Sequence, residues 1–320
     1  MVSPDKRISV HSETESANAK FTPLRTEQLS VGFDDIGGME ELKQQARMKI
    51  IMPFKNPQLF QKFGKSAGGG ILLYGPPGCG KTFYAKAIAK ECGAAFINVE
   101  IDDILDMWLG NSEKNIGELF FAAREYRPCV VFIDEIDALG RSRGRTLSSA
   151  ITTTVNKFLA EFDGLASDND NILIIGATNA LWDVDTAFKR PGRFDRVMFV
   201  PPPDEHSRAE IFRLGLSKLP VADCIDADTL AHKTSKFSGA DIMGLLDRAA
   251  EQVLEEILQK GKERLITNKD LLNALKKTRS TTLEWLESAK SYVEFSNTTG
   301  QYDELKAYLE RKSKKRRVGF

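Results

Sequence analysis

The chain has 320 residues, of which 42% are hydrophobic and 28% charged, so it is long enough to bury a core in about two domains. Lys plus Arg and Asp plus Glu each total 45, and this balance gives no support to a nucleic-acid or anionic-membrane partner. The four cysteines form no Cys-x-x-Cys pair and the histidines number only three, so neither a zinc site nor a disulfide framework is indicated and a reducing compartment is expected.

The N-terminal segment 1–32 is expected to be a flexible arm, because it is rich in Ser, Thr, Lys and Glu and has no apolar period. It lacks the apolar core of a signal peptide. No apolar run reaches the ~18 to 20 residues that span a bilayer. We therefore expect a cytoplasmic protein without a membrane span. The basic tail KSKKRRVGF (312–320) leaves a nuclear address open, although a solvated, frayed end is favoured.

Short apolar runs rich in β-branched residues alternate with longer helical stretches between residues 33 and 203. The runs are GILLYG (70–75), AFINVE (95–100), CVVFIDE (129–135), NILIIGATN (171–179) and RVMFV (196–200). Strands this apolar are usually covered by helices on both faces. The pattern predicts an α/β domain built on a parallel five-stranded sheet.

The strands stop at PPPD (201–204), and helical patterns follow. Ser238 with Asp241, and Thr267 with Asp270, are typical of helix starts. We expect a small helical domain at 204–280, and then C-terminal helices with the basic tail at 281–320.

The strongest motif is GPPGCGKT (75–82), which follows a predicted strand, leads into a helical stretch, and satisfies G-x-x-x-x-G-K-[ST]. Its glycines let backbone N–H groups surround phosphate oxygens, Lys81 adds a charge at the β and γ phosphates, and Thr82 offers a hydroxyl to Mg²⁺. The alternative is a chance Gly-rich turn, which the flanking strand and helix disfavour. The residues expected to hold ATP here are Pro76, Pro77, Gly78, Cys79, Gly80, Lys81, Thr82 and Phe83.

Paired carboxylates end the apolar run VVFIDEID (130–137). Asp134 is placed to hold Mg²⁺ through its water shell, and Glu135 to polarise the water that attacks the γ-phosphate. Asn179 ends the next strand and is expected to orient that water or sense the γ-phosphate. Alone, the two acids would be loop residues and Asn179 a turn residue.

Over residues 33–278 the chain resembles the AAA ATPases of the clade that includes valosin-containing protein, katanin and the vacuolar-sorting type of disassembly ATPases. The most specific piece is FKRPGRFDR (188–196), which is similar to the second region of homology of that family. The resemblance implies that Arg190 and Arg193 reach into the neighbouring subunit's site and that the chain forms a ring, a homo-hexamer. An arginine there neutralises charge on the transferred phosphoryl group. In isolation, two surface arginines beside a turn would be favoured.

Three shorter segments resemble the same family more weakly. FDDIGG (33–38) resembles the family segment whose backbone lines the adenine pocket, which implies roles for Asp35, Ile36 and Gly37. FSGAD (237–241) resembles the lid segment where Gly239 and Ala240 close that pocket. FDGL (162–165) is similar to the intersubunit signalling segment.

Two loops are implied to line the central pore. MWLG (107–110) falls where the family places an aromatic and an apolar residue, so Trp108 and Leu109 are expected to grip an extended polypeptide. Taken alone, this pair would be the edge of a core helix. GRSRGRT (140–146) carries Arg141, Arg143 and Arg145, which either line the lower pore or belong to a solvated loop.

The chain departs from the family pattern after Asn179, where Ala180, Leu181 and Trp182 replace the usual Arg-Pro. The departure removes none of the groups that the resemblance implies are catalytic. Cys79 stands at a helix N-terminus, where the pKa of a thiol can be lowered, so an oxidant-sensitive ATPase is expected.

The leading hypothesis is an ATP hydrolase that remodels proteins by threading polypeptide through a hexameric pore. The short N-terminal arm cannot hold a recruiting domain, so a motif or an adaptor is expected to deliver substrate. Two alternatives remain. A ring ATPase acting on nucleic acid would usually need a dominant basic stripe. A weakly hydrolysing scaffold would not need Glu135, Asn179, Arg190 and Arg193 together.

Overall fold

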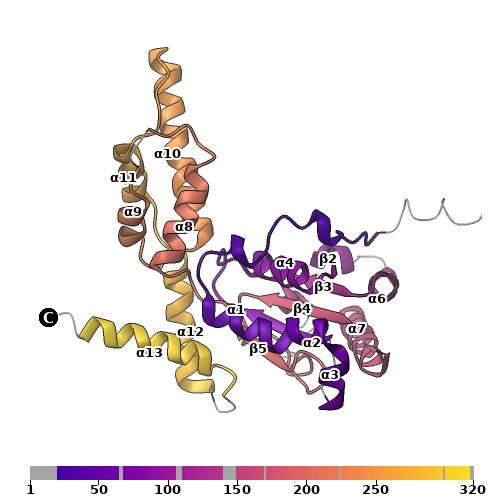
Figure 1. The fold of residues 1–320 in the computed structure, drawn as a ribbon. Helices are drawn as coiled ribbons and strands as arrows, with labels where there is room; N and C mark the ends of the chain where they lie inside the picture. The colour runs from indigo at the N-terminus through magenta and orange to yellow at the C-terminus, as the bar shows by residue number, and fades with distance from the viewer. Residues whose placement is uncertain are drawn as a thin grey trace, which may run out of the picture.

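The computed structural model describes residues 20–64, 68–105, 110–139, 149–168, 171–222, 225–297 and 300–317. Its centre is a parallel five-stranded sheet in the order β2-β3-β4-β1-β5 (Figure 1). The strands are β1 (Gly68–Tyr74), β2 (Ala95–Val99), β3 (Cys129–Ile133), β4 (Ile172–Thr178) and β5 (Arg196–Phe199). The predicted fold class and all five strands are therefore confirmed.

Both faces of the sheet are buried, as the apolar runs predict. In β3, for example, Val131 and Ile133 belong to one core cluster and Val130 and Phe132 to the other. The first face is covered by α6 (Asn111–Glu125) and α7 (Ser149–Asp168). The second is covered by α1 (Glu40–Ala46), the π-helical turn η4 (Arg47–Ile51) and α4 (Lys81–Cys92). Shorter helices complete this domain: η2 (Thr26–Gln28), η3 (Phe33–Asp35), α2 (Met52–Lys55), α3 (Pro57–Lys62), α5 (Ile101–Ile104) and η5 (Ile136–Ala138).

Residues 20–32 pack onto the sheet, which corrects the expectation of a flexible arm for this part of the chain. The backbone of Leu24 exchanges hydrogen bonds with Phe96 of the edge strand β2, at 2.8 and 2.9 Å. Phe21 and Leu29 are buried, each in one of the two core clusters. An edge strand presents unpaired backbone groups, so a short bridge there covers part of it. Residues 1–19 lie outside the described part.

A helical unit follows β5 and stands beside the sheet (Figure 1). It has its own core, formed by residues such as Phe212, Leu230, Leu245 and Leu271. Ser238 caps the longest helix, as predicted, since its Oγ accepts the N–H of Asp241 at 3.0 Å. The helices are α8 (Glu205–Leu216), α9 (Ala227–Lys233), α10 (Gly239–Lys260) and α11 (Asn268–Lys277).

Two C-terminal helices, α12 (Thr282–Ser296) and α13 (Asp303–Arg317), return to the sheet domain. Helices were expected there, but not their contribution to the sheet's core through Ala289 and Leu305. Glu304 Oε2 also accepts the backbone N–H of Phe199 in the edge strand β5, at 2.9 Å. No helix in the described ranges is both long enough and apolar enough to cross a membrane.

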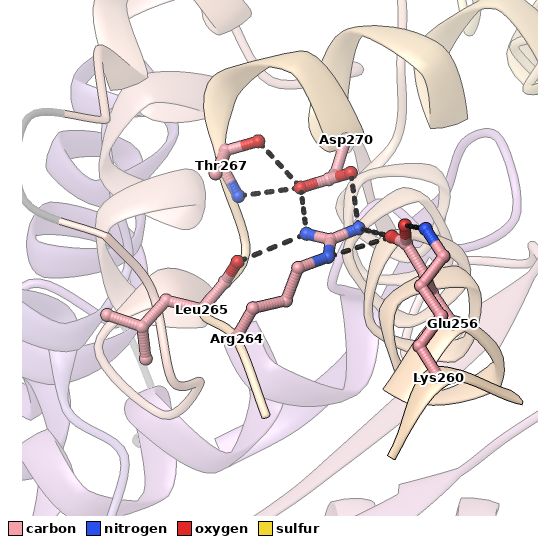
Figure 2. A network of polar contacts seen from close by, with 6 residues as sticks. All are labelled: Glu256, Lys260, Arg264, Leu265, Thr267 and Asp270. Carbon is pink, nitrogen blue, oxygen red and sulfur yellow. Dashed lines mark hydrogen bonds and ion pairs between the residues drawn. The ribbon is translucent and has the colours of Figure 1, made fainter. Parts of the chain in front are cut away.

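An ion-pair network ties the end of α10 to the start of α11 (Figure 2). Arg264 Nε donates to Glu256 at 2.8 Å, and Arg264 Nη1 donates to Asp270 at 2.8 Å. Asp270 also accepts from the backbone N–H and the hydroxyl of Thr267, at 2.9 and 2.6 Å. These donors, with Arg264 first among them, lower the pKa of Asp270 to about 2.

The network predicts a specific loss of stability in acid. A carboxyl with a depressed folded pKa stabilises the fold above its unfolded pKa of about 3.9, and this contribution disappears as the pH falls toward the folded value. We therefore expect Asp270→Asn to lower the melting temperature near neutral pH and to lose this effect in acid. Thermal denaturation of both proteins between about pH 6 and about pH 2.5 tests this. A constant difference across that range would contradict it.

Candidate nucleotide-binding site

The phosphate loop, residues 75–82, connects the end of β1 to the start of α4. Gly75 and Gly78 have φ values of 157° and 70°. A Cβ at Gly75 would lie 2.2 Å from the carbonyl oxygen of Val200, and a Cβ at Gly78 would lie 2.6 Å from the Cβ of Ala240. Side chains do not fit at these positions. The loop therefore presents bare backbone at a helix N-terminus, which suits the phosphates of a nucleotide.

Lys81 lies inside this loop and is only 8% exposed. Its Nζ donates to the carbonyl oxygens of Gly75 and Pro76, at 3.0 and 3.1 Å, and to Oδ1 of Asn179 at 2.6 Å. Burial lowers the pKa of the ammonium group, and nearby carboxylates oppose that shift. The lysine is thus held between the loop and the end of β4.

Asp134 and Glu135 follow β3 in different environments. Asp134 is partly buried, and its Oδ2 accepts from the hydroxyl of Thr82 at 3.4 Å. Glu135 is exposed, and its backbone adopts φ 50° and ψ 42°. A non-glycine residue in this left-handed region is uncommon and is a known feature of active sites. The geometry suits Thr82 and Asp134 as a Mg²⁺ pair, and it leaves the Glu135 carboxylate free to contact a water.

A pocket of about 360 Å³ opens beside these carboxylates. Sequence reasoning missed Asn98, Glu100 and Asp102, which lie on its wall. Asn98 could have been found, because it is the exposed polar residue of the otherwise apolar run AFINV, next to β3 in a parallel sheet. The full lining consists of Thr82, Asn98, Glu100, Ile101, Asp102, Asp134 and Glu135.

Asn179 lies at the end of β4, as predicted, and its side chain reaches Lys81. The turn around it is braced. Thr178 Oγ1 donates to Asp137 at 2.7 Å and accepts the backbone N–H of Ala180 at 2.9 Å. Leu181 is fully buried. The departure from Arg-Pro therefore gives a packed turn in which Thr178, next to Asn179, is bonded to the Asp137 carboxylate, two positions after Glu135.

The helical unit approaches the phosphate loop at the start of α10. The backbone N–H of Ala240 donates to the carbonyl oxygen of Gly78 at 3.2 Å, and a Cβ on Gly239 would lie 3.4 Å from that same oxygen. On the other side, Gly37 lies against α8, where an added Cβ would lie 3.0 Å from Glu210 Cβ. FDDIGG therefore meets the helical unit at α8, and FSGAD, which begins α10 of that unit, meets the phosphate loop. Asp35 and Ile36 lie immediately before Gly37 in the chain. Phe83 is exposed on α4.

The two arginines of FKRPGRFDR differ in the exposure and in the contacts of their side chains. Arg193 is 13% exposed and forms a bidentate pair with Asp163, at 2.8 and 2.6 Å, while it also donates to the carbonyl oxygen of Ala187 at 2.7 Å. Its hydrogen bonds lower the pKa of Asp163. Arg190 is exposed, and its side chain forms no hydrogen bond or ion pair with another described residue, although its charge also lowers the pKa of Asp163. Of these two arginines, only Arg190 has a side chain that no other described residue holds in place.

The expected pore residues Trp108, Leu109, Arg141 and Arg143, together with Arg145, lie outside the described residues. The two segments can be located only by the described elements that precede them in the chain. The first follows α5 at the end of β2, and the second follows η5 after β3.

The expected low pKa of Cys79 is wrong. The thiol is 3% exposed, and burial raises its pKa to about 12 despite the positive charge of Lys81. We now expect Cys79 in the folded protein to resist iodoacetamide at about pH 7.5, because the thiolate is the reactive species. Mass spectrometry of the folded protein, with the denatured protein as control, measures this. Rapid stoichiometric labelling of folded Cys79 would contradict it.

Comparison with known protein families gives two matches. Residues 71–202 match the ATPase family associated with various cellular activities (AAA), and residues 224–273 match the AAA+ lid domain. The first match contains the phosphate loop, the paired carboxylates, Asn179 and both arginines, and the second contains most of the helical unit beside the sheet. The parallel sheet, its phosphate loop and these two matches together show that the chain contains an AAA ATPase domain followed by an AAA+ lid domain.

Proposed function

We propose that the chain is an ATP-driven protein remodelling motor, related to the clade of valosin-containing protein and katanin. In this proposal it hydrolyses ATP at the interfaces of a homo-hexameric ring and moves polypeptide through the central pore. The strongest support for an active site shared between two subunits is the position of the arginine side chains. The pocket beside Glu135 has no arginine among its described lining residues, whereas Arg190 is exposed and unpaired within the described chain.

Each group has a defined role in hydrolysis. Lys81 binds the β and γ phosphates, Glu135 takes a proton from the attacking water, and Asn179 orients that water. Thr82 and Asp134 would hold Mg²⁺, largely through water, and the ion would neutralise charge on the phosphate oxygens. Arg190 of the neighbouring subunit stabilises the charge of the transition state. Arg193 can join it only after it leaves Asp163.

The pore assignments extend this proposal to the substrate. Trp108 and Leu109 grip the backbone and side chains of an extended polypeptide, and Arg141 and Arg143 favour acidic stretches below them. A cytoplasmic ring of this kind needs an adaptor or a recruitment motif. The domain limits we propose are 33–203 for the nucleotide-binding domain, 204–280 for the lid and 281–320 for the C-terminal helices and tail.

The test measures ATP hydrolysis per subunit against protein concentration, with Arg190→Ala beside the wild type. A shared site predicts a rate that rises with concentration and is lost in the variant. Trp108→Ala is expected to keep basal hydrolysis and to lose unfolding of a tagged fluorescent substrate. Stimulation by DNA or RNA in place of protein would instead favour a nucleic-acid motor.

A further inference from the structure

Helix α12 contacts the loop after β4 as well as the lid. Its Trp285 donates from the indole Nε1 to the backbone oxygen of Asn179, at 2.5 Å. The side chain of the same Asn179 accepts from Lys81 at 2.6 Å. The sensor residue is therefore held from two sides: by the phosphate loop through its side chain, and by the C-terminal region through its main chain.

Aromatic packing fixes the position of Trp285. Its ring stacks on Phe199 at the end of β5, with centroids 6.2 Å apart and planes at 13°. On α12, Tyr292 stacks on Trp182 of the loop after Asn179, at 4.4 Å and 5°. Trp182 and Trp285 also contact each other, at 5.9 Å. Helix α12 thus packs at once against the loop after β4 and against the edge strand β5.

The other end of this helix is joined to the lid. Thr281, immediately before α12, donates from its hydroxyl to Asp241 Oδ1 at 2.9 Å and from its N–H to Asp241 Oδ2 at 3.2 Å. Thr282 Oγ1 donates to the carbonyl oxygen of Lys236 at 2.5 Å. Asp241 also accepts the N–H of Ser238 at 2.8 Å, in the capping box that begins α10. A change in lid orientation therefore acts directly on α12.

These contacts close a path around the nucleotide site. It runs from the phosphate loop to the start of α10, through the joint at Thr281 into α12, and back through Trp285 to Asn179. We propose that Trp285 is a positioning residue for hydrolysis, which holds the backbone of Asn179 and makes its orientation depend on the position of the lid. This inference rests on the proposed role of Asn179 in ATP hydrolysis.

The test compares Trp285→Phe with the same substitution at Trp182. Phenylalanine keeps a ring for stacking but removes the N–H that Asn179 accepts. We expect Trp285→Phe to lower kcat for ATP about five- to twentyfold, because a small displacement of a positioning group is costly, while the affinity for a fluorescent ATP analogue stays within about twofold. Trp182→Phe is the matched control, since the ring nitrogen of Trp182 has no hydrogen bond to any described residue; less than about a twofold change in kcat is expected.

A double-variant cycle with Asn179→Ala distinguishes a positioning role of Trp285 from a general disturbance of the fold. If Trp285 acts through Asn179, Trp285→Phe should add no further loss of kcat to Asn179→Ala. Additive losses, or an unchanged kcat in Trp285→Phe, would overturn the inference. If Trp285→Phe fails to fold, Thr281→Val takes its place in the same cycle. This variant removes the hydroxyl that donates to Asp241 of the lid, and it does not touch Asn179. If Asn179→Ala itself leaves kcat unchanged, the proposed role of Asn179 fails instead.

Discussion

Glu135→Gln is expected to lower kcat for ATP hydrolysis by about 10²- to 10⁴-fold and to leave ATP binding intact. The substitution keeps the size of the side chain but removes the group that accepts a proton from water. Binding should persist, because the groups proposed to hold the phosphates are Lys81 and the phosphate loop, in which Lys81 is anchored to Gly75 and Pro76, and Glu135 is not among them. Single-turnover hydrolysis and the affinity for a fluorescent ATP analogue measure the two effects separately.

Glu100→Gln is the matched control for this prediction. Glu100 lies on the wall of the same pocket and loses the same charge, so the variant reports the effect of charge without the proton acceptor. We expect less than about a tenfold loss of kcat, as for a charge that is not at the reacting atoms. Equal losses in both variants would mean that the pocket's charge, and not Glu135 as a base, governs the rate.

Arg190→Ala is expected to lower kcat by about 10³-fold or more, the usual effect of removing an arginine finger. Its side chain is exposed in the isolated subunit, so the melting temperature should hardly change. Arg190→Lys should recover only part of the rate, because an ammonium lacks the planar fork that contacts two phosphoryl oxygens. A variant with wild-type kcat and an intact fold would refute the finger assignment.

Arg193→Ala provides a contrast within the same segment. Arg193 pairs with Asp163 and contacts Ala187 inside its own subunit, so its removal leaves the Asp163 carboxylate and the Ala187 carbonyl oxygen without those hydrogen bonds. We expect a lower melting temperature together with any loss of activity. The two arginines should therefore separate into one that affects only the rate and one that also affects the fold.

The sequence predicted the sheet and the nucleotide loop because their signals are local. An apolar run such as CVVFI is buried on both faces, and the GPPGCGKT spacing needs no distant partner. The sequence did not predict the packing of residues 20–32, the pairing of Arg193 with Asp163 or the contact of Trp285 with Asn179. These contacts join residues that are 30 to 106 positions apart, and no local period encodes them.

Cys79 shows a second limit of prediction from the sequence. A thiol at a helix N-terminus beside a lysine is expected to ionise easily. In the folded chain burial dominates, and the pKa moves in the opposite direction. The solvation of one side chain depends on the lid and on the strands that enclose it, which a motif of eight residues does not report.

The central claim, that each active site is shared between two subunits, is tested most directly by mixing Glu135→Gln with Arg190→Ala. Each variant alone is expected to be nearly inactive. In mixed rings, an Arg190→Ala subunit keeps its own Glu135 and receives Arg190 from a Glu135→Gln neighbour. Random mixing at equal amounts should therefore restore about a quarter of the sites. A mixture that forms mixed rings but remains as inactive as either variant alone would contradict a shared active site.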